Sequence, residues 1–564
     1  MSTITEQAVN GLKKSLLDAA GRAVADGVFP AEPLPSFSIE IPGDVSHGDY
    51  ATNIAMTSAR ALHMAPRKIA EAIRDRIDLS ETYFERCEIA GPGFINFFLS
   101  ARYYAGVMQE IADEGDRYGR SDYGRGKRVL VEFVSANPTG PMHMGNARGG
   151  ALGDCLAAVL DTAGFHVERE FYVNDAGNQI EKFGLSLSVR YQQLFLGEDA
   201  VPLPEECYQG VDIIDRAREY ADAHGDELMH VSDGERRKAL VDFALPRNIA
   251  KMKADIAKYR IVYDQWFLES TLHESGQVQE TIQLLADKGL TYEKDGAVWY
   301  RATDFGAEKD EVLVRANGNP TYFAADIAYH RNKFAVRGFD ECIDVWGADH
   351  HGHVARMKGA MNAIGLDGDK LTVVLMQLVN LVRDGKPVKM SKRTGKAIQL
   401  ADLLDEVPVD AARFLFNMRE ATSQMDFDLD LAVQQDAQNP VYYVQYANAR
   451  ICSIVRALEK EGVIARPCSA EEQMLLSAPE ERELIRHLAA YPLEIVAAAK
   501  EYDPARITRY VITLANLFHK FYNACRVKGE SDGLMQARLQ LCLAVRTVIR
   551  NVLTMFKISA PDQM

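Results

Sequence analysis

The stretch that decides the fold runs from Arg128 to Asn146. It reads Arg-Val-Leu-Val-Glu-Phe-Val, followed by Ser-Ala-Asn-Pro-Thr-Gly-Pro-Met-His-Met-Gly-Asn. An apolar run that ends in a loop rich in proline and glycine is typical of a buried strand. Apolar residues then recur at helical spacing, which predicts a helix that starts near Asn146: Leu152, Leu156, Val159 and Leu160. Strand, loop and helix in this order indicate a parallel α/β sheet.

The loop between this strand and helix has the properties of an anion site. The free N–H groups and the positive end of the helix point toward the loop, where a triphosphate fits. Gly145 would let a nucleotide ring approach the backbone closely, and His143 can donate a hydrogen bond to a phosphoryl oxygen. The alternative interpretation is a tight β–α turn with a surface histidine.

A second segment, Lys389-Met-Ser-Lys-Arg-Thr-Gly395, follows an apolar run and the turn Arg383–Pro387. Its two lysines are three residues apart and Arg393 follows them, which makes a cationic clamp suited to pyrophosphate. Taken alone, the segment is equally compatible with a basic surface loop.

The composition places these motifs in an ordinary folded protein. The chain has 564 residues, 47% hydrophobic and 26% charged, which excludes collagen-like, coiled-coil and disordered chains. Its longest apolar stretch, Leu371–Val382, is shorter than the roughly 20 residues of a membrane span, and Met1–Asn10 shows no secretion signal. The eight cysteines form no CxxC pair. We therefore expect a reduced, cytoplasmic, multidomain protein without a membrane partner.

Three domains are predicted. Residues 1–115 read as a mixed α/β domain that includes a short strand over Phe37–Ile41, residues 116–435 as the parallel-sheet domain with an insertion at about 184–250, and residues 436–564 as helical. The net charge of −16 argues against nonspecific nucleic-acid binding as the main role. The helical part alone is slightly basic, which leaves open both a local contact with a phosphate backbone and an ordinary helical domain.

Together, the two motifs resemble the paired signatures of class I aminoacyl-tRNA synthetases. Residues 143–146 resemble the HIGH motif and residues 389–393 the KMSKS motif; the match departs at Asn146, where the motif has a second histidine. The resemblance implies a Rossmann-like parallel-sheet catalytic domain that binds ATP with Mg²⁺ on its phosphates. It implies catalytic roles for His143, Asn146, Lys389 and Lys392, and ATP contacts that add Gly145, Met390 and Ser391.

Three further segments resemble the arginyl-tRNA synthetase family: Ser135–Pro141, Tyr263–Ser270 and Tyr322–Tyr329. The resemblance implies that Glu269 and Asp326 hold the substrate guanidinium with Tyr322 beside it. It also implies that Ser135 and Asn137 lie at the other end of the amino acid. If the third segment is helical, Tyr322 and Asp326 share one face. Without the resemblance to the family, we would interpret Glu269 and Asp326 as solvated acids on helix surfaces.

The segment Trp346–His353 fits a strand end followed by a glycine-containing loop, where open α/β sheets place ligand contacts. The family implies that Gly347 and Asp349 contact the adenosine ribose. The histidines at 350, 351 and 353 resemble a metal cluster, but they have no partner at a familiar zinc spacing, so we expect no protein-ligated metal site.

The flanking segments resemble the same family. Residues 47–56 resemble its N-terminal domain, which contacts the tRNA elbow, and Tyr442–Arg450 resembles the start of its helical anticodon-binding domain. Tyr446 and Arg450, at i and i+4, would stack on nucleotides or would be a packing residue and a surface charge. The implied activity is ATP-dependent ligation of L-arginine to the 3′ end of tRNA(Arg) by a monomer. The rival interpretations are another class I synthetase, such as a cysteinyl enzyme with zinc ligands, and a silent tRNA-binding paralogue.

Overall fold

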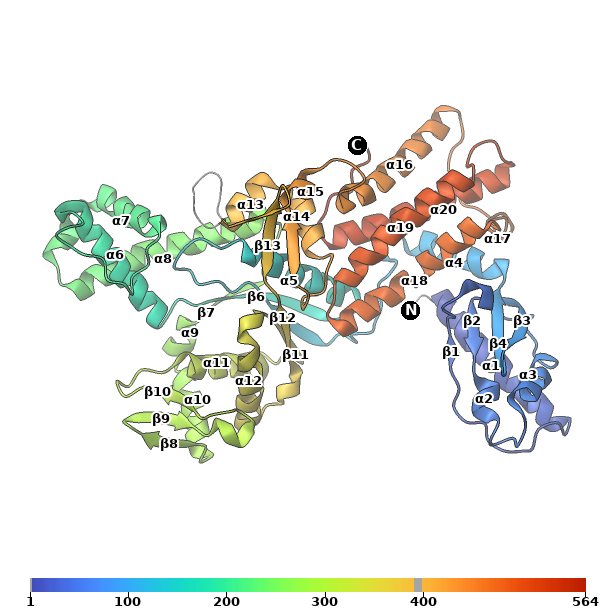
Figure 1. Ribbon diagram of the computed structural model, residues 1–564, viewed down its shortest axis with the longest axis horizontal. Helices are drawn as coiled ribbons and strands as arrows, with labels where there is room; N and C mark the ends of the chain where they lie inside the picture. Colours follow the sequence, from blue (N-terminus) through green and yellow to red (C-terminus); the bar gives the residue numbers. More distant parts are fainter. Residues whose placement is uncertain (1–2, 390–397) are drawn as a thin grey trace.

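A five-stranded parallel sheet lies at the centre of the molecule (Figure 1). The computed structural model describes residues 3–389 and 398–564. The strand order is β12-β11-β5-β6-β7, with every neighbouring pair parallel. The strands are β5 (Arg128–Glu132), β6 (His166–Val173), β7 (Gln265–Leu268), β11 (Glu341–Gly347) and β12 (Leu371–Met376). Because β5 is central, its carboxyl end lies where the connections diverge to either side, which is the usual ligand position in such sheets.

Helix α5 (Gly145–Thr162) follows β5 and packs directly on the sheet. Its small residues permit this close approach: a Cβ atom at Gly153 would lie 2.2 Å from the Phe133 ring. The predicted helix starting near Asn146 is therefore confirmed.

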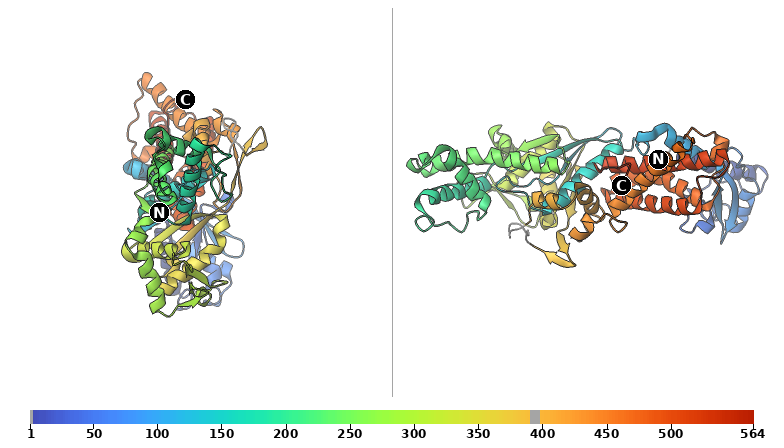
Figure 2. Two further views of the ribbon diagram at one scale, coloured as in Figure 1. Left: turned by 90° about the vertical axis from the view of Figure 1, so that its left-hand side faces the viewer. Right: turned by 90° about the horizontal axis from the view of Figure 1, so that it is seen from above.

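Two smaller sheets and several helices complete this part of the chain (Figures 1 and 2). The residues predicted as an insertion fall within α6 (Asn178–Leu196), α7 (Val211–His224) and α8 (Asp233–Lys258), which project from one end of the molecule. The next helices along the chain are α9 (Ser270–Glu274), α10 (Gln277–Asp287), α11 (Tyr322–Arg331) and α12 (His351–Ile364). The small sheets are β10-β9-β8 (Glu311–Val314, Ala297–Tyr300, Thr291–Lys294) and β14-β13-β15 (Lys386–Val388, Val379–Arg383, Met425–Asp428). Helices α13 (Leu400–Glu406), α14 (Val409–Phe416) and α15 (Leu429–Val433) lie beside the latter.

The N-terminal part combines a sheet of order β1-β2-β4-β3 with four helices. These elements are α1 (Thr3–Ala25), β1 (Ile39–Glu40), β2 (Tyr50–Thr52), α2 (Ile54–Ser58), α3 (Pro66–Arg74), β3 (Phe84–Ala90), β4 (Phe94–Leu99) and α4 (Ala101–Glu114). The strand predicted over Phe37–Ile41 was too long, since only Ile39 and Glu40 pair with β2. The backbone of Ser38 instead bonds to side chains: its N–H donates to Asn53 Oδ1 and its carbonyl accepts from Thr52 Oγ1.

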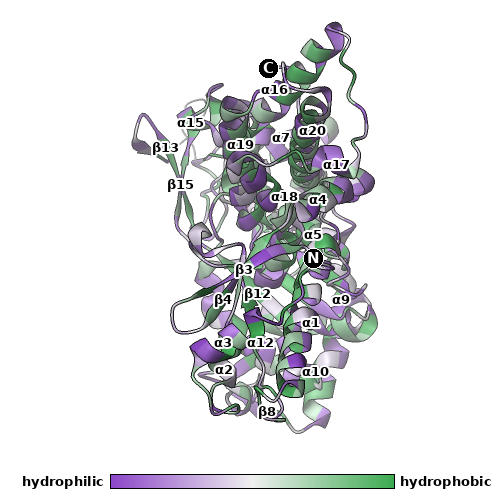
Figure 3. Ribbon diagram, turned by 90° about the vertical axis from the view of Figure 1, so that its right-hand side faces the viewer, coloured by the Kyte–Doolittle hydropathy of each residue, from purple (hydrophilic) through white to green (hydrophobic). Residues whose placement is uncertain are grey.

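Residues 436–564, all of them described, form helices joined by loops. They are α16 (Pro440–Lys460), α17 (Ala470–Gln473), α18 (Pro479–Glu501), α19 (Ala505–Ala524) and α20 (Asp532–Met555). Figure 3 shows hydrophobic and hydrophilic residues alternating along these helices, as packed amphipathic helices require. The predicted combination of a parallel-sheet body, a mixed N-terminal part and a helical C-terminal part is confirmed. The domain divisions at 115/116 and 435/436 stay predictions.

Asp49 joins the N-terminal part to the helical part. Its Oδ2 accepts from the Leu99 N–H (2.8 Å), and its Oδ1 pairs with Arg486 of α18 (2.7 Å). Arg486 also donates to the Tyr104 hydroxyl (3.2 Å). The acid in the block resembling the family's N-terminal domain thus has a structural role between two parts of the chain.

A buried carboxylate joins α5 to the end of the chain. Asp154 forms ion pairs with Arg413, Lys557 and Arg169, with N···O distances of 2.5, 2.9 and 3.0 Å. Burial alone would raise the pKa of Asp154, but these three cations hold it below its usual value. Arg413 also donates to the Phe556 carbonyl (2.6 Å), so the segment after α20 is bonded to the sheet-packing helix. In the described part of the chain, no helix is both long and apolar enough to cross a membrane.

Candidate active site

The chain leaves β5 through a strained turn. Val134 and Ser135 have φ of 71° and 41°, a region that a β-branched residue enters only at a cost of about 1–3 kcal/mol. Two hydrogen bonds hold the turn: Ser135 Oγ donates to Glu132 Oε1 (2.9 Å) and accepts from the Tyr172 N–H (3.1 Å). Ser135 is thereby fixed at the carboxyl end of the central strand, and Asn137 lies exposed two residues further on.

The HIGH-like residues form the start of α5: Met144 is its N-cap, Gly145 and Asn146 begin its first turn, and His143 directly precedes it. The His143 N–H donates to Asn146 Oδ1 (3.0 Å), and the Gly145 N–H donates to His143 Nδ1 (3.2 Å). A ring nitrogen that accepts carries no proton, so Nε2 of His143 holds the proton and is a donor. The His143 side chain is exposed, which leaves this donor available to a ligand at the helix N-terminus.

The segment that follows the second motif is bonded to the residues at the start of α5. Lys389 directly follows β14, while Met390, Ser391 and Lys392 lie outside the described residues. On the far side, the Met144 N–H donates to the Ile398 carbonyl (3.0 Å) and the Leu400 N–H to the Met142 carbonyl (2.9 Å). Residues 142–144 and 398–400, which are far apart in the sequence, are thus joined by backbone hydrogen bonds.

A cavity of about 520 Å³ opens at the carboxyl ends of β5, β6 and β11. Predicted site residues that line it are Ser135, Asp326, Gly347 and Asp349. A Cβ atom at Gly347 would lie 2.4 Å from Asp349 Oδ1, so a larger residue there would displace the Asp349 carboxylate. The Asp349 side chain itself is exposed, beside His350 (3.7 Å). Among residues 3–389 and 398–564, no three His, Cys, Asp or Glu side chains are grouped as metal ligands.

Glu269 and Tyr322 line a neighbouring cavity of about 260 Å³. Glu269 is 3% exposed; its Oε2 accepts from the Asn174 amide (2.8 Å), and its Oε1 lies 3.5 Å from His273 Nε2. The Tyr322 hydroxyl accepts from the Gln179 N–H (3.1 Å). Burial raises the pKa of Glu269 to about 7; the Tyr172 hydroxyl opposes this shift, and Asp326 and Asp175 add to it.

The structure therefore places the two predicted guanidinium ligands in adjoining cavities. Tyr172 lies between them: burial, together with the charges of Glu269 and Asp326, raises its pKa well above the usual value. Asp326 is also accompanied by His353 Nε2, 3.3 Å from its Oδ2. Sequence reasoning missed Tyr172 and Asn174, although both stand at the carboxyl end of β6, where ligand contacts are expected.

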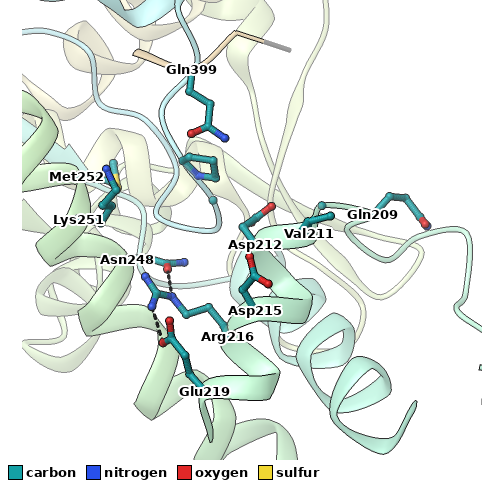
Figure 4. A pocket seen from close by; sticks show the side chains of 13 residues that line it. Gln209, Val211, Asp212, Asp215, Arg216, Glu219, Asn248, Lys251, Met252 and Gln399 are labelled. Carbon is teal, nitrogen blue, oxygen red and sulfur yellow. Dashed lines mark hydrogen bonds and ion pairs between the residues drawn. The ribbon is translucent and has the colours of Figure 1, made fainter. Parts of the chain in front are cut away.

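Another cavity, of about 640 Å³, lies between the loop before His143 and helices α7 and α8 (Figure 4). In it, Arg216 Nε donates to Asn248 Oδ1 (2.8 Å) and Arg216 also pairs with Glu219 (2.6 Å). The Asn248 amide donates in turn to the Pro138 carbonyl (3.0 Å). The projecting helices therefore support the loop that carries His143, a role that sequence reasoning missed.

Tyr446 and Arg450 lie in an aromatic cluster on α16 and α19. Tyr446 is 41% exposed, and the Arg450 guanidinium carbon is 4.3 Å from the Tyr522 ring centre and 6.0 Å from that of Tyr446. His519 packs against Tyr443 and Tyr446, and burial followed by the charge of Arg450 lowers the pKa of His519 to about 4. Uncharged rings beside a guanidinium form a surface on which unpaired bases can stack.

Comparison with known proteins assigns the family. A family model described as tRNA synthetases class I (R), catalytic domain, matches residues 108–453. A model of the arginyl tRNA synthetase N terminal domain matches residues 10–99, and one of the DALR anticodon binding domain matches residues 444–564. The chain belongs to the arginyl-tRNA synthetase family. The predicted family is therefore confirmed.

Individual members of the arginyl-tRNA synthetase family match over the whole chain. An arginine–tRNA ligase of Caldanaerobacter subterraneus is 56% identical over 564 residues, covering 100% of both chains. One of Acetivibrio thermocellus is 54% identical over the same length. The solved Thermus thermophilus arginyl-tRNA synthetase is 22% identical with a TM-score of 0.73, covering 99% of this chain and 100% of that one, and supports the fold alone.

Proposed function

We propose that this chain joins L-arginine to the 3′ end of tRNA(Arg) in two ATP-dependent steps. The observation that carries the proposal is the joining of Met142–Met144 to Ile398–Leu400 at one end of the parallel sheet. Two acids, Glu269 and Asp326, line the adjoining cavities. A phosphate-binding helix end beside paired acids fits a nucleotide and a guanidinium substrate.

In the first step, the arginine carboxylate attacks the α-phosphorus of ATP in line. The bond to the bridging oxygen breaks, so arginyl-adenylate and pyrophosphate form. The Nε2–H of His143, the Asn146 amide and Lys389 stabilise the negative charge that develops on the phosphoryl oxygens. Lys392, Met390 and Ser391 would act in the same role from the undescribed segment, and Gly347 and Asp349 would hold the ribose.

Mg²⁺ would arrive bound to the ATP phosphates, where it neutralises charge. A hard ion that keeps several water ligands needs few protein ligands, which suits the described site. Every other contribution to the first step comes from the chain's own residues, which position the substrates and stabilise the developing charge.

In the second step, a hydroxyl of the terminal adenosine ribose attacks the adenylate carbonyl, its proton is released, and AMP leaves. No side chain serves as a nucleophile, so positioning supplies the acceleration. Ser135 and Asn137 would bind the amino-acid end of arginine, with Tyr322 beside its guanidinium.

For the tRNA, we propose that residues 1–115 contact the elbow and that residues 436–564 contact the anticodon region. Tyr446 and Arg450 would be contacts in the latter. We further propose a cytoplasmic monomer.

Arginine binding should depend on pH through Glu269. A carboxylate whose pKa is about 7 in the empty pocket must lose its proton to pair with a guanidinium. Below pH 7 the Kd for arginine should therefore rise by about tenfold per pH unit, and above pH 8 it should level off. Calorimetric titration of the tRNA complex with arginine between pH 5.5 and 8.5 measures this. A flat profile would remove Glu269 from the binding site.

Pyrophosphate exchange tests the function directly. Exchange of labelled pyrophosphate into ATP should occur with arginine alone among the twenty amino acids, and we measure it with and without tRNA. Exchange with a different amino acid would keep the class I chemistry and discard the roles of Glu269 and Asp326. Absence of exchange despite tRNA binding would identify a silent paralogue.

A further inference from the structure

Three buried acids form a row across the centre of the parallel sheet. Asp344 of β11 is in register with Glu132 of β5, and Glu132 is in register with Glu170 of β6. Their exposed fractions are 0%, 7% and 0%. Like charges on directly neighbouring strands repel one another, and burial strengthens the repulsion, so the row requires cations.

A single helical segment supplies these cations. Helix α11 runs into a π-helical turn, Asn332–Val336, in which Lys333 is fully buried. Lys333 Nζ donates to Glu132 Oε2 (2.6 Å) and to Asp344 Oδ1 (2.9 Å). Arg337 follows the turn and pairs with Glu170. Turns of this kind are found frequently at functional sites.

The Lys333 ammonium remains charged in this position. Burial alone would lower its pKa, but the carboxylates of Asp344 and Glu132 raise it above its usual value. It is thus a permanent cation between two strands, and each carboxylate it holds has a further partner.

The first of these partners is Ser135. Glu132 uses Oε2 for Lys333 and Oε1 for the Ser135 hydroxyl (2.9 Å), so the cation fixes the carboxylate that fixes Ser135. Ser135 sits in the strained turn after β5, two residues before Asn137.

The second partner leads to Asp326. Asp344 Oδ2 lies 3.1 Å from His330 Nε2, and His330 Nδ1 lies 2.8 Å from the Asp326 carbonyl oxygen. The imidazole ring thus bridges the Asp344 carboxylate and the Asp326 backbone. Lys333 is therefore linked to Ser135 on one side and to the backbone of Asp326 on the other.

We propose that Lys333 is a positioning residue for the amino-acid substrate: through Glu132 it orients Ser135, and through Asp344 and His330 it orients Asp326. The proposal rests on the function proposed above. Lys333 touches no substrate itself. The acids of the row are already paired with Lys333 and Arg337. Glu269 and Asp326 therefore remain available to pair with the substrate guanidinium.

Lys333→Met tests the proposal, with Arg413→Met as the matched control. Both substitutions remove a fully buried cation that pairs with buried acid, but Arg413 lies on α14 and contacts Asp154 rather than the cavity. In pyrophosphate exchange with tRNA, Lys333→Met should raise the KM for arginine by about tenfold or more and change the KM for ATP by less than about threefold. Arg413→Met should lower Tm without this split.

Equal changes in both KM values for Lys333→Met, or an unchanged arginine KM, would overturn the proposal and leave Lys333 a structural residue. If Lys333→Met fails to fold, His330→Asn decides, because it cuts only the link to Asp326 and leaves Lys333 with both acids. It should raise the arginine KM alone, by about threefold to tenfold, and an unchanged value would contradict the proposal. An unmodified protein that shows no exchange with arginine would instead refute the proposed function.

Discussion

Glu269→Gln is expected to lower kcat/KM for arginine by about 10²- to 10³-fold, the loss found when one partner of a buried, hydrogen-bonded charge pair is neutralised. Glu269 is 3% exposed, so water cannot replace the lost carboxylate. The new amide would also direct N–H groups toward a guanidinium that can only donate. Steady-state exchange kinetics with varied arginine measures the effect.

The same neutralisation at Asp326 should cost less. Its side chain is 35% exposed and has His353 as a neighbour, so Asp326→Asn should lower kcat/KM for arginine by about tenfold to a hundredfold. Glu274→Gln is the control. Glu274 is exposed on α9, the helix that directly follows Glu269, so its substitution should leave kcat/KM for arginine unchanged. In all three variants the KM for ATP should stay within about threefold of that of the unmodified protein. A parallel rise in the KM values for arginine and for ATP would indicate misfolding instead.

His143→Ala is expected to reduce adenylate formation by about 10²-fold or more, as for other donors to a transition-state oxyanion. The side chain is exposed, and its one described hydrogen bond is local, so Tm should hardly change. Rapid-quench measurement of adenylate with the tRNA complex separates this step from transfer to tRNA.

His166→Ala supplies the comparison for His143. His166 is also exposed, but it begins β6 and so lies at the opposite edge of the sheet from the strand ends. It should retain full activity. A decrease of less than about threefold for His143→Ala would exclude the Nε2–H as a catalytic donor.

Local patterns in the sequence were sufficient for the parts of the site that lie on one element. The strand-loop-helix over residues 128–162 follows from hydrophobic spacing and glycine. Tyr322 and Asp326 were placed on one face only on the condition that their segment is helical, and the structure shows that it is helix α11. The resemblance to the family supplied the roles of these residues, and the comparisons confirm the family while the residue roles stay predictions.

The rest of the site depends on which strands are neighbours in the sheet. The hydrophobic periodicity of the sequence predicts individual strands but not their order. Glu132, Glu170 and Asp344 are unremarkable singly; they form a row only because β11, β5 and β6 are adjacent and in register. Lys333 could not be recognised for the same reason, since a buried lysine looks like a surface one until its partners are known. The support of Pro138 by Asn248 likewise arises from tertiary packing alone.

The bond between Asp154 and Lys557 has a consequence for synthesis on the ribosome. Asp154, the buried carboxylate of helix α5, pairs with Lys557, which lies 403 residues later in the chain. Before Lys557 has been synthesised, Asp154 can form ion pairs only with Arg169 and Arg413. Arg413 also cannot yet form its hydrogen bond to the Phe556 carbonyl. Helix α5 of a nascent chain therefore reaches its final stability only after Phe556 and Lys557 have been synthesised.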